Sequence, residues 1–379
     1  MKTAATPNQT VTPAPAMCIS IETGAKDWKL FMSTGLGQHP RERTVPARDL
    51  ERLKAEIVRA REHFGLAADA PVSSCYEAGR DGFWLHRALV AMGVANQVID
   101  SSSIEVPRRK RRAKTDRVDG RSLLRMLWRY HNGETKVFQV VNVPSEEEED
   151  ARQLHRALET TKKDHNRLVC RIKGLLATQG IHLKELSGLE EKLPRLRLWN
   201  GKPLPQGLLT RIGNEWQKAV QLKAQISELG KERRRLLKEA KDQASECARK
   251  LIQLRAIGEN AGWMFSTELF AWRQFRNRRQ VGGVVGLTGT PYQSGDEARE
   301  QGISKAGNRW VRGMVIEIAW GWLRYQPESE LSQWYQRRFG HGNSRLRRIG
   351  IVALARRMLI ALWRYLQTGT PPAGALLKG

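Results

Sequence analysis

The chain has 379 residues, and its 65 Lys and Arg residues exceed its 39 Asp and Glu residues, which gives a formal net charge of +26. This length is enough for two or three domains with separate cores. The charge predicts a polyanionic partner, and nucleic acid is favoured over a membrane surface because the basic residues recur in several clusters with Trp and Tyr among them. No apolar run is long enough to cross a membrane and no apolar signal sequence opens the chain, so we expect a cytoplasmic protein with no membrane partner.

The four cysteines are far apart in the sequence and form no Cys-x-x-Cys pair. This spacing argues against both a zinc site and a disulfide framework. We expect each cysteine to be a small buried apolar residue: Cys18, Cys75, Cys170 and Cys247.

The N-terminal part begins with a polar tail and a strand pair. Residues 1–16 are rich in Thr, Pro, Ala, Asn and Gln without apolar periodicity, which predicts a disordered tail. Residues 17–22 and 28–32 are typical of two short strands around a turn, and Glu22 ends the first of them. An isolated glutamate at this position is most often only an exposed strand end, so further acids are needed before it indicates a site.

A further short strand ends in Glu77, and a small-residue turn and an apolar helix follow it. Residues 93–100 predict another strand. The order of strand, acid, strand, acid and strand favours an α/β sheet with carboxylates at the strand ends, where open α/β sheets place their sites. We therefore expect residues 17–144 to form one α/β domain.

Two more acids follow a dense basic run. Asp116 and Asp119 open a predicted helix and are one turn apart, so their Cβ atoms lie about 5–6 Å from each other on one face. Paired carboxylates beside basic groups fit a divalent metal that holds a phosphodiester, with the basic groups on the flanking phosphates. The alternative is that the two acids only cap the helix and favour its first turn. The basic side chains expected to bind nucleic acid here are Arg108, Arg109, Lys110, Arg111, Arg112 and Lys114.

Residues 145–250 predict two long amphipathic helices. Apolar residues recur at heptad spacing from Leu154 to Leu175 and again from Ala219 to Cys247, with His165 as a packing residue in the first seam. The Gly- and Pro-rich stretch 181–213 predicts a connector. We expect an antiparallel coiled-coil arm or a dimerisation element.

Residues 251–379 predict a mostly helical third unit. Arg276, Arg278 and Arg279 lie beside Trp272 and Phe275 and are typical of a nucleic-acid face. A glycine-dense stretch then ends at Ser294-Gly295, and four polar groups follow at a spacing that lets them point at one phosphate: Lys305, Asn308, Arg309 and Arg312. Arginines of the last helices, Arg345 and Arg348 among them, are further candidate phosphate contacts.

Two sets of residues together resemble insertion-sequence family one-ten transposases. The segments Ile21-Glu22, Tyr76-Glu77-Ala78-Gly79 and Lys114 to Asp119 are similar to the four-acid signature of the family's ribonuclease H-like, resolvase-type domain. The glycine-dense stretch, the Ser294-Gly295 pair and the run Ile303-Ser-Lys-Ala-Gly-Asn308 are similar to its second half. This chain has Glu at the first acid position, where the family usually has Asp, and it carries Gly289-Thr290 as an addition before Pro291; Asp27 and Ser304 are the competing assignments.

The resemblance implies the fold, the activity and the partners. It implies a ribonuclease H-like α/β domain, then the coiled-coil arm, then a mostly α-helical domain over residues 251–379 that bears the serine. It implies that Glu22, Glu77, Asp116 and Asp119 bind Mg²⁺ or Mn²⁺ and that Ser294 is the nucleophile joined covalently to DNA. Double-stranded DNA, a structured guide RNA and further copies of the chain, as a dimer or tetramer, are the implied partners.

Two alternatives to a serine-dependent transposase stay open. In the first, the protein is a metal-dependent nuclease or Holliday-junction resolvase in which water attacks and Ser294 only binds phosphate. In the second, it is a non-catalytic nucleic-acid scaffold with a decayed acid set. The reason to consider it is that position 22 is Glu, where the family usually has Asp.

Overall fold

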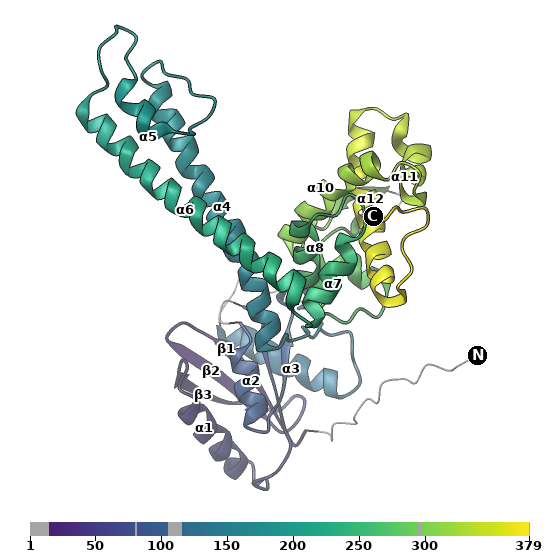
Figure 1. Cartoon of the computed structure of the whole chain (residues 1–379). Helices are drawn as coiled ribbons and strands as arrows, with labels where there is room; N and C mark the ends of the chain where they lie inside the picture. The colour runs from purple at the N-terminus through teal and green to yellow at the C-terminus, as the bar shows by residue number, and fades with distance from the viewer. Residues whose placement is uncertain (1–14, 80–81, 105–115, 295–296, 379) are drawn as a thin grey trace. The chain divides into compact units, whose positions relative to one another are not determined.

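A computed structural model of the protein describes residues 15–79, 82–104, 116–294 and 297–378 (Figure 1). The chain divides into two compact units, Met1–Val143 and Pro144–Gly379. The first unit holds a mixed α/β sheet and the second is mostly helical, as the sequence predicted at this level. The expected division of the second unit into an arm over 145–250 and a domain over 251–379 stays a prediction.

The N-terminal unit is built on a five-stranded sheet in the order β3-β2-β1-β4-β5. β1 pairs antiparallel with β2 and parallel with β4, and β5 pairs parallel with β4. The edge strand β3 was missed by the sequence analysis because only Val45 of its residues is buried, which leaves no apolar alternation to detect. The strand bounds are β1 (Met17–Thr23), β2 (Asp27–Ser33), β3 (Arg41–Pro46), β4 (Val72–Glu77) and β5 (Ala95–Ile99).

Helices cover both faces of this sheet. α1 (Leu50–His63) and α2 (Trp84–Ala91) pack on the face that carries Ile19 and Ile21 of β1. α3 (Asp116–His131) packs on the opposite face, which carries Cys18 of β1 and Cys75 of β4, and the short turn η1 (Ser101–Ser103) follows β5. Alternate residues of β1 thus point into two separate cores, one on each face of the sheet, and α3 packs in the core that contains Cys18.

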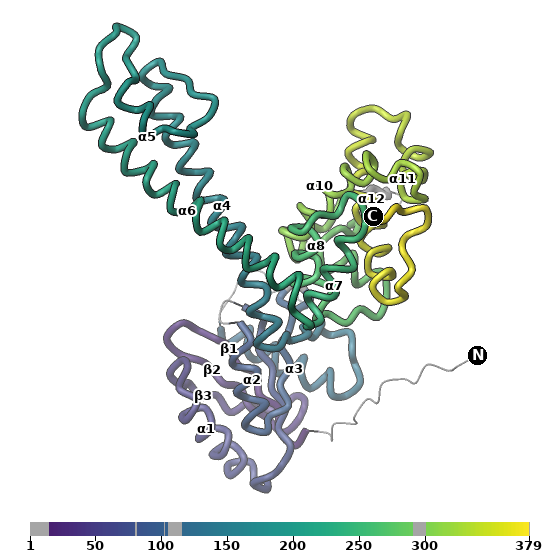
Figure 2. Tube along the Cα trace, viewed as in Figure 1, coloured from purple at the N-terminus to yellow at the C-terminus, as the bar shows by residue number. Residues whose placement is uncertain are grey.

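The second unit begins with two long helices that lie side by side, α4 (Glu146–Ala177) and α6 (Gln206–Glu239) (Figure 2). They are antiparallel, because Ile172 and Leu176 near the end of α4 pack on Leu208 and Ile212 near the start of α6. Ser145 caps α4 and forms a capping box with Glu148. The connector contains α5 (Leu189–Lys192) and η3 (Leu193–Arg195), and it is shorter than predicted because α6 begins at Gln206.

In the described residues, the rest of the second unit is a helical core with a β-hairpin inserted. Its largest apolar cluster joins Trp322 of α10 (Arg309–Tyr325) with Leu354 and Met358 of α12 (Ser344–Thr368). The elements are α7 (Gln243–Ile252), α8 (Glu259–Phe265), η4 (Ser266–Phe270), α9 (Arg278–Val284), β6 (Gly289–Ser294), β7 (Glu297–Ile303), α10 (Arg309–Tyr325), α11 (Glu330–Tyr335), η5 (Gln336–Gly340) and α12 (Ser344–Thr368).

The cysteine prediction holds at three positions and is wrong at one. Cys18, Cys75 and Cys247 are buried, and burial raises the pKa of the Cys18 thiol to about 12 and that of Cys247 to about 11. Cys170 is exposed, because it lies on the side of α4 that faces away from the packed seam. Among the described residues, no helix is both long enough and apolar enough to cross a membrane.

Candidate functional site

The strand-end acids of β1 and β4 lie side by side. Ile21 and Tyr76 are partners in the parallel pairing of β1 with β4, so the next residues, Glu22 and Glu77, are neighbours at the carboxyl ends of their strands. Glu22 is four residues after Cys18, and Glu77 is two residues after Cys75. Because alternate residues of a strand point to the same face, both glutamates lie on the sheet face that α3 covers. Both glutamates are partly exposed.

Helix α3 brings its first turn to the same end of the sheet. Ser20 Oγ donates a hydrogen bond to the carbonyl oxygen of Gly120 (2.6 Å) near the start of α3. At the end of α3, Trp128 Nε1 donates to Ser33 Oγ (2.8 Å), and Ser33 pairs with Cys18 at the beginning of β1. The helix therefore runs antiparallel to β1. Its first turn, with Asp116 and Asp119, lies at the carboxyl end of the strands.

Close packing sets how near α3 comes to the sheet. Gly120 is buried, and a Cβ atom added there would collide with the ring of Phe31 on β2. Only glycine allows the helix backbone to approach the ring in this way. The sequence alone gave no signal for this contact, because it joins residues far apart along the chain.

Ion pairs hold the start of α3 to the antiparallel edge of the sheet. Arg117 Nε lies 2.8 Å from Glu42 Oε2 on β3, and Arg121 Nε donates to Glu42 Oε1 (2.6 Å). Partial desolvation raises the pKa of Glu42, but the hydrogen bonds and charges of the two arginines outweigh this effect and hold the pKa below its usual range.

One of the predicted metal ligands is paired with a lysine. Lys29 is the cross-strand partner of Glu22, and its Nζ lies 2.8 Å from Asp116 Oδ2. The sequence analysis missed Lys29, although the strand-turn-strand pattern over residues 17–32 would have placed it opposite Glu22. Asp27, the alternative first acid, begins β2 near the same end of the sheet.

The four acids fit a hard divalent cation by chemistry, since carboxylate oxygens are the ligands that Mg²⁺ and Mn²⁺ prefer. Their side chains are not gathered around one point: in the part of the chain that the structure describes, no three His, Cys, Asp or Glu side chains are placed to share an ion. The metal assignment stays a prediction. The basic run 108–112 and Lys114 lie outside the described residues.

Ser294 is the last residue of β6 and pairs with Glu297 at the far end of the β6–β7 hairpin. The glycine-dense stretch before it thus leads into a strand. Ser304, the competing serine, lies at the opposite end of the hairpin, where its backbone N–H donates to the carbonyl of Thr288 (2.9 Å). The structure therefore separates the two serines by the length of β7.

The β6–β7 hairpin has a bulge near its base. Gly289 pairs with Ile303, but Pro291 pairs with Glu300, so the register shifts across Thr290. Thr290 Oγ1 donates to the carbonyl of Gly302 (3.0 Å) at this point. Between these two pairs β7 has two residues and β6 has one, so the extra residue of this bulge is on β7, where Gly302 has a positive φ of 93°. Beyond the bulge the pairing is regular up to Ser294.

Two glycines lie where chain segments approach closely at the base of the hairpin. Gly286 and Gly307 both have positive φ angles, 67° and 79°. A Cβ atom on Gly286 would collide with the backbone of Ala306, and one on Gly307 would collide with the backbone of Val284. Glycine at these two positions lets the two chain segments approach each other closely.

The four polar groups after the hairpin have different surroundings. Lys305 and Arg309 are exposed, and Lys305 has a positive φ of 57°, which is uncommon for a residue with a side chain. Arg312 Nη1 donates to the carbonyl of Val285 (3.0 Å). Of the other predicted contacts, Arg276, Arg278 and Arg279 are exposed around the start of α9.

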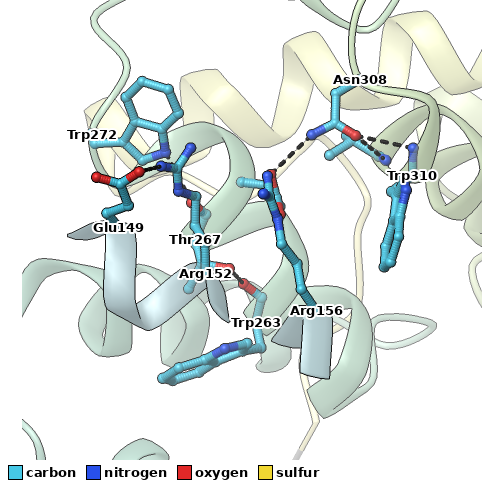
Figure 3. A network of polar contacts seen from close by, with 10 residues as sticks. Glu149, Arg152, Arg156, Trp263, Thr267, Trp272, Asn308 and Trp310 are labelled. Carbon is cyan, nitrogen blue, oxygen red and sulfur yellow. Dashed lines mark hydrogen bonds and ion pairs between the residues drawn. The ribbon is translucent and has the colours of Figure 1, made fainter. Parts of the chain in front are cut away.

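Asn308 is the N-cap of α10 and part of a buried polar network (Figure 3). Its side-chain oxygen accepts from the backbone N–H groups of Trp310 and Val311, and its Nδ2 donates to Glu268 Oε2 (3.0 Å). Both ends of the Asn308 amide are therefore engaged within the protein. Its role as a phosphate contact stays a prediction.

Glu268, on η4, is the centre of this network and is only 3% exposed. Arg156 of α4 donates to both of its carboxylate oxygens, at 2.7 and 3.0 Å. Burial raises the pKa of Glu268, but the hydrogen bond and charge of Arg156 outweigh burial and hold the pKa below its usual range. Sequence reasoning missed this pair because its members are separated by 112 positions.

Known proteins similar to this chain are transposases. A family profile described as "Transposase IS116/IS110/IS902 family" matches residues 248–336, which include the β6–β7 hairpin. A protein of Sinorhizobium fredii (strain NBRC 101917 / NGR234) named "Putative transposase y4rJ" is 38% identical over 384 residues, covering 96% of this chain and 95% of that protein. Another from the same organism, "Putative transposase y4qE", is 29% identical over 258 residues, covering 67% of this chain and 59% of that protein. Because the first similarity extends over nearly all of both chains, the protein belongs to the IS116/IS110/IS902 family of transposases.

Proposed function

We propose that the protein cuts and rejoins DNA at the ends of an insertion sequence through a covalent serine–DNA intermediate, with Ser294 as the nucleophile. The observation that carries the proposal is the arrangement of Glu22, Glu77 and the first turn of α3 at one end of a sheet, in a chain that belongs to a transposase family. The position of Ser294 at the end of a hairpin supports it, because the backbone there is held by strand pairing.

The chemistry consists of two phosphoryl transfers. Ser294 Oγ gives up its proton and attacks phosphorus, the bond from phosphorus to the leaving sugar oxygen breaks, and that oxygen takes a proton to become a free hydroxyl. In the second step a strand hydroxyl attacks the serine phosphodiester, which joins the DNA and returns the serine. The number of phosphodiester bonds is unchanged, so no nucleotide hydrolysis is required.

The four acids serve this reaction as the ligands of a divalent cation. Glu22, Glu77, Asp116 and Asp119 would hold Mg²⁺ or Mn²⁺, which supplies neutralisation of the charge that develops on the transferring phosphoryl group. For Asp116 to bind metal it must leave Lys29, an exchange with a small cost because both side chains are well exposed. The strand order β3-β2-β1-β4-β5, with α3 packed on one face of the sheet and its first turn at the carboxyl ends of β1 and β4, supports a ribonuclease H-like assignment.

The remaining parts of the proposal concern partners. Resemblance to the family supports a structured guide RNA that pairs with DNA and is bound by the protein through its shape. It also supports a dimer or tetramer, with coiled-coil pairing along α4 and α6 as one contributor. The acids and the serine are then supplied by one chain or by different copies.

One observation favours a second candidate, a non-catalytic nucleic-acid scaffold. In the described residues the acids are not gathered, and Asp116 is paired with Lys29. In a scaffold these carboxylates would only stabilise the start of α3.

A covalent-adduct assay tests the proposal. Purified protein is incubated in Mg²⁺ with RNA from the element's flanks and labelled supercoiled DNA that carries the element ends, then denatured and examined for DNA attached to protein. We expect an adduct that is lost in Ser294→Ala and in Asp116→Asn, and retained in the matched control Ser304→Ala. Cleavage without an adduct would instead identify a nuclease or resolvase that uses water, and binding without any cleavage would identify the scaffold.

A further inference from the structure

A cavity of about 1470 Å³ lies in the second unit, between α12, the start of α9 and the base of the β6–β7 hairpin. We call it the α12 groove. Five arginines of α12 line it: Arg345, Arg348, Arg356, Arg357 and Arg364. Arg278, Arg279 and Lys305 line it as well, and Glu330 is the only acid among the described residues that line the groove.

Ion pairs within the described part of the chain do not compensate the charge of the α12 groove. None of these eight cations forms an ion pair with a carboxylate of the described residues. Like charges held together on a surface repel one another and concentrate anions near it. The groove is therefore suited to a ligand with many negative charges.

The dimensions of the groove indicate a polymer. Arg345 and Arg364 are 19 positions apart on α12, which corresponds to about 28 Å of helix. One strand of a DNA duplex presents a phosphate every 3.4 Å of its axis, so this length corresponds to about eight phosphates. The cavity is also larger than the roughly 300–1,000 Å³ of small-molecule sites.

The arginines are held apart by packing. The Arg357 guanidinium lies 4.4 Å from the centre of the Trp334 ring, a cation–π contact. Arg356 crosses α9 at Gly282, where an added Cβ would lie 3.1 Å from Arg356 Nε. Exposed apolar side chains such as Ile349 lie between the cations, and they suit the sugar parts of a backbone better than free phosphate ions.

The groove leads to the hairpin that carries Ser294. Gly289 at the start of β6 and Ile303 at the end of β7 both line it. From Gly289 to Ser294 the strand advances by five residues, or about 17 Å. A DNA backbone lying in the groove would thus extend toward the far end of the hairpin.

We propose that the α12 groove binds the sugar-phosphate backbone of the duplex DNA that is presented to the β6–β7 hairpin. The choice of DNA rests on the function proposed above, since Ser294 is the group that would react with it. The groove contributes affinity and orientation without reading bases, because its contacts are made to phosphates and sugars.

The test uses the full-length protein and fluorescein-labelled duplex DNA carrying an element end, with binding followed by anisotropy at several KCl concentrations. The groove variant is Arg348→Gln/Arg357→Gln/Arg364→Gln, which spares Arg356 because of its packing on α9. The matched control is Arg167→Gln/Arg211→Gln/Arg234→Gln, with three exposed arginines of α4 and α6. Thermal melts by circular dichroism verify that both variants are folded.

We expect the groove variant to bind DNA about tenfold or more weakly at physiological salt, and the slope of log K against log salt to decrease in magnitude by about 2 to 3, since three phosphate contacts are lost. The control should stay within about twofold of the wild type, since it changes the same net charge elsewhere. Unchanged affinity and slope in the groove variant would overturn the proposal. A loss of affinity for a structured RNA competitor, with DNA binding intact, would overturn it in favour of an RNA surface.

This outcome is independent of the covalent step. Ser294→Ala should bind the duplex as the wild type does. A groove variant that binds weakly, together with a wild type that forms no adduct, would support the groove and reject the serine mechanism. A wild type that forms the adduct, with a groove variant that binds normally, would support the serine mechanism and reject the groove.

Discussion

At the scale of single residues, Gly120 determines how α3 sits on the sheet. A methyl group at this position meets the ring of Phe31, so Gly120→Ala must push the helix outward or distort the ring. Overpacking of this kind lowers the free energy of unfolding by about 1–3 kcal/mol. The higher helix propensity of alanine offsets about 1 kcal/mol of this loss. We expect the variant to be net destabilised in urea unfolding.

The matched control for that variant is Gly213→Ala on α6, where nothing lies within 4 Å of the added Cβ. It should be neutral or stabilising by up to about 1 kcal/mol. Equal stability of Gly120→Ala and the wild type would show that the contact with Phe31 is not tight in solution.

His155 of α4 predicts a pH dependence. It is fully buried, neither ring nitrogen has a hydrogen-bond partner in the described part of the chain, and burial lowers its pKa to about 4. Nearby Glu159 and Glu268 oppose this shift, and Arg233 and Lys162 reinforce it. Because the folded pKa lies below the ordinary value of about 6.5, the unfolded chain takes up the proton first, and stability is lost as pH falls from about 6.5 toward 4.

The corresponding measurement is the free energy of unfolding at pH 7.5 and pH 5. We expect His155→Leu to lose about 2 kcal/mol less than the wild type over this interval. The control His165→Leu lies on the same helix and leaves His155 in place, so it should follow the wild type. Parallel curves for His155→Leu and the wild type would contradict the assignment.

At the scale of elements, the ion pair between Arg156 and Glu268 joins α4 to η4. The hydrogen bond from Asn308 to Glu268 adds the start of α10 to this contact. Arg156→Ala leaves the carboxylate of Glu268 buried without its main partner. Breaking a buried pair costs about 3–5 kcal/mol, and because the Arg156 side chain is 43% exposed we expect the lower end of this range. Denaturant unfolding measures the loss.

A double-mutant cycle separates the pair from the packing around it. Adding Glu268→Gln to Arg156→Ala removes the unpaired charge, so the double variant should be less destabilised than the sum of the two single variants by about 1–3 kcal/mol. Arg167→Ala, which removes a solvent-exposed pair with Asp164 on the same helix, should cost under about 1 kcal/mol. Additivity in the cycle would mean that the carboxylate finds another partner.

At the scale of the whole molecule, the two units have separate apolar cores. Units with their own cores unfold as separate cooperative transitions unless a large interface joins them. We expect two transitions in differential scanning calorimetry, with Gly120→Ala lowering only one midpoint and Arg156→Ala lowering only the other. A single transition lowered by both variants would refute this independence.

The local pattern of the sequence predicted several strands and helices, whereas the four-acid metal site stays a prediction. Alternating apolar residues predicted the strands that end in Glu22 and Glu77, and heptad spacing predicted two long helices. The polar edge strand β3 was missed because a strand with one buried residue carries no period of two. Cys170 was predicted to be buried on the basis of residue type, although its position on α4 decides its exposure.

The sequence by itself determined the charge, the order of the elements and the resemblance to a transposase family, since these depend on residue type and on spacing along the chain. Tertiary structure decided which residues meet. Four contacts join distant positions: Lys29 with Asp116, Gly120 with Phe31, Arg156 with Glu268, and the α12 arginines with Lys305 around one groove. No local period records such contacts, because they follow from how helices and strands pack once the chain has folded.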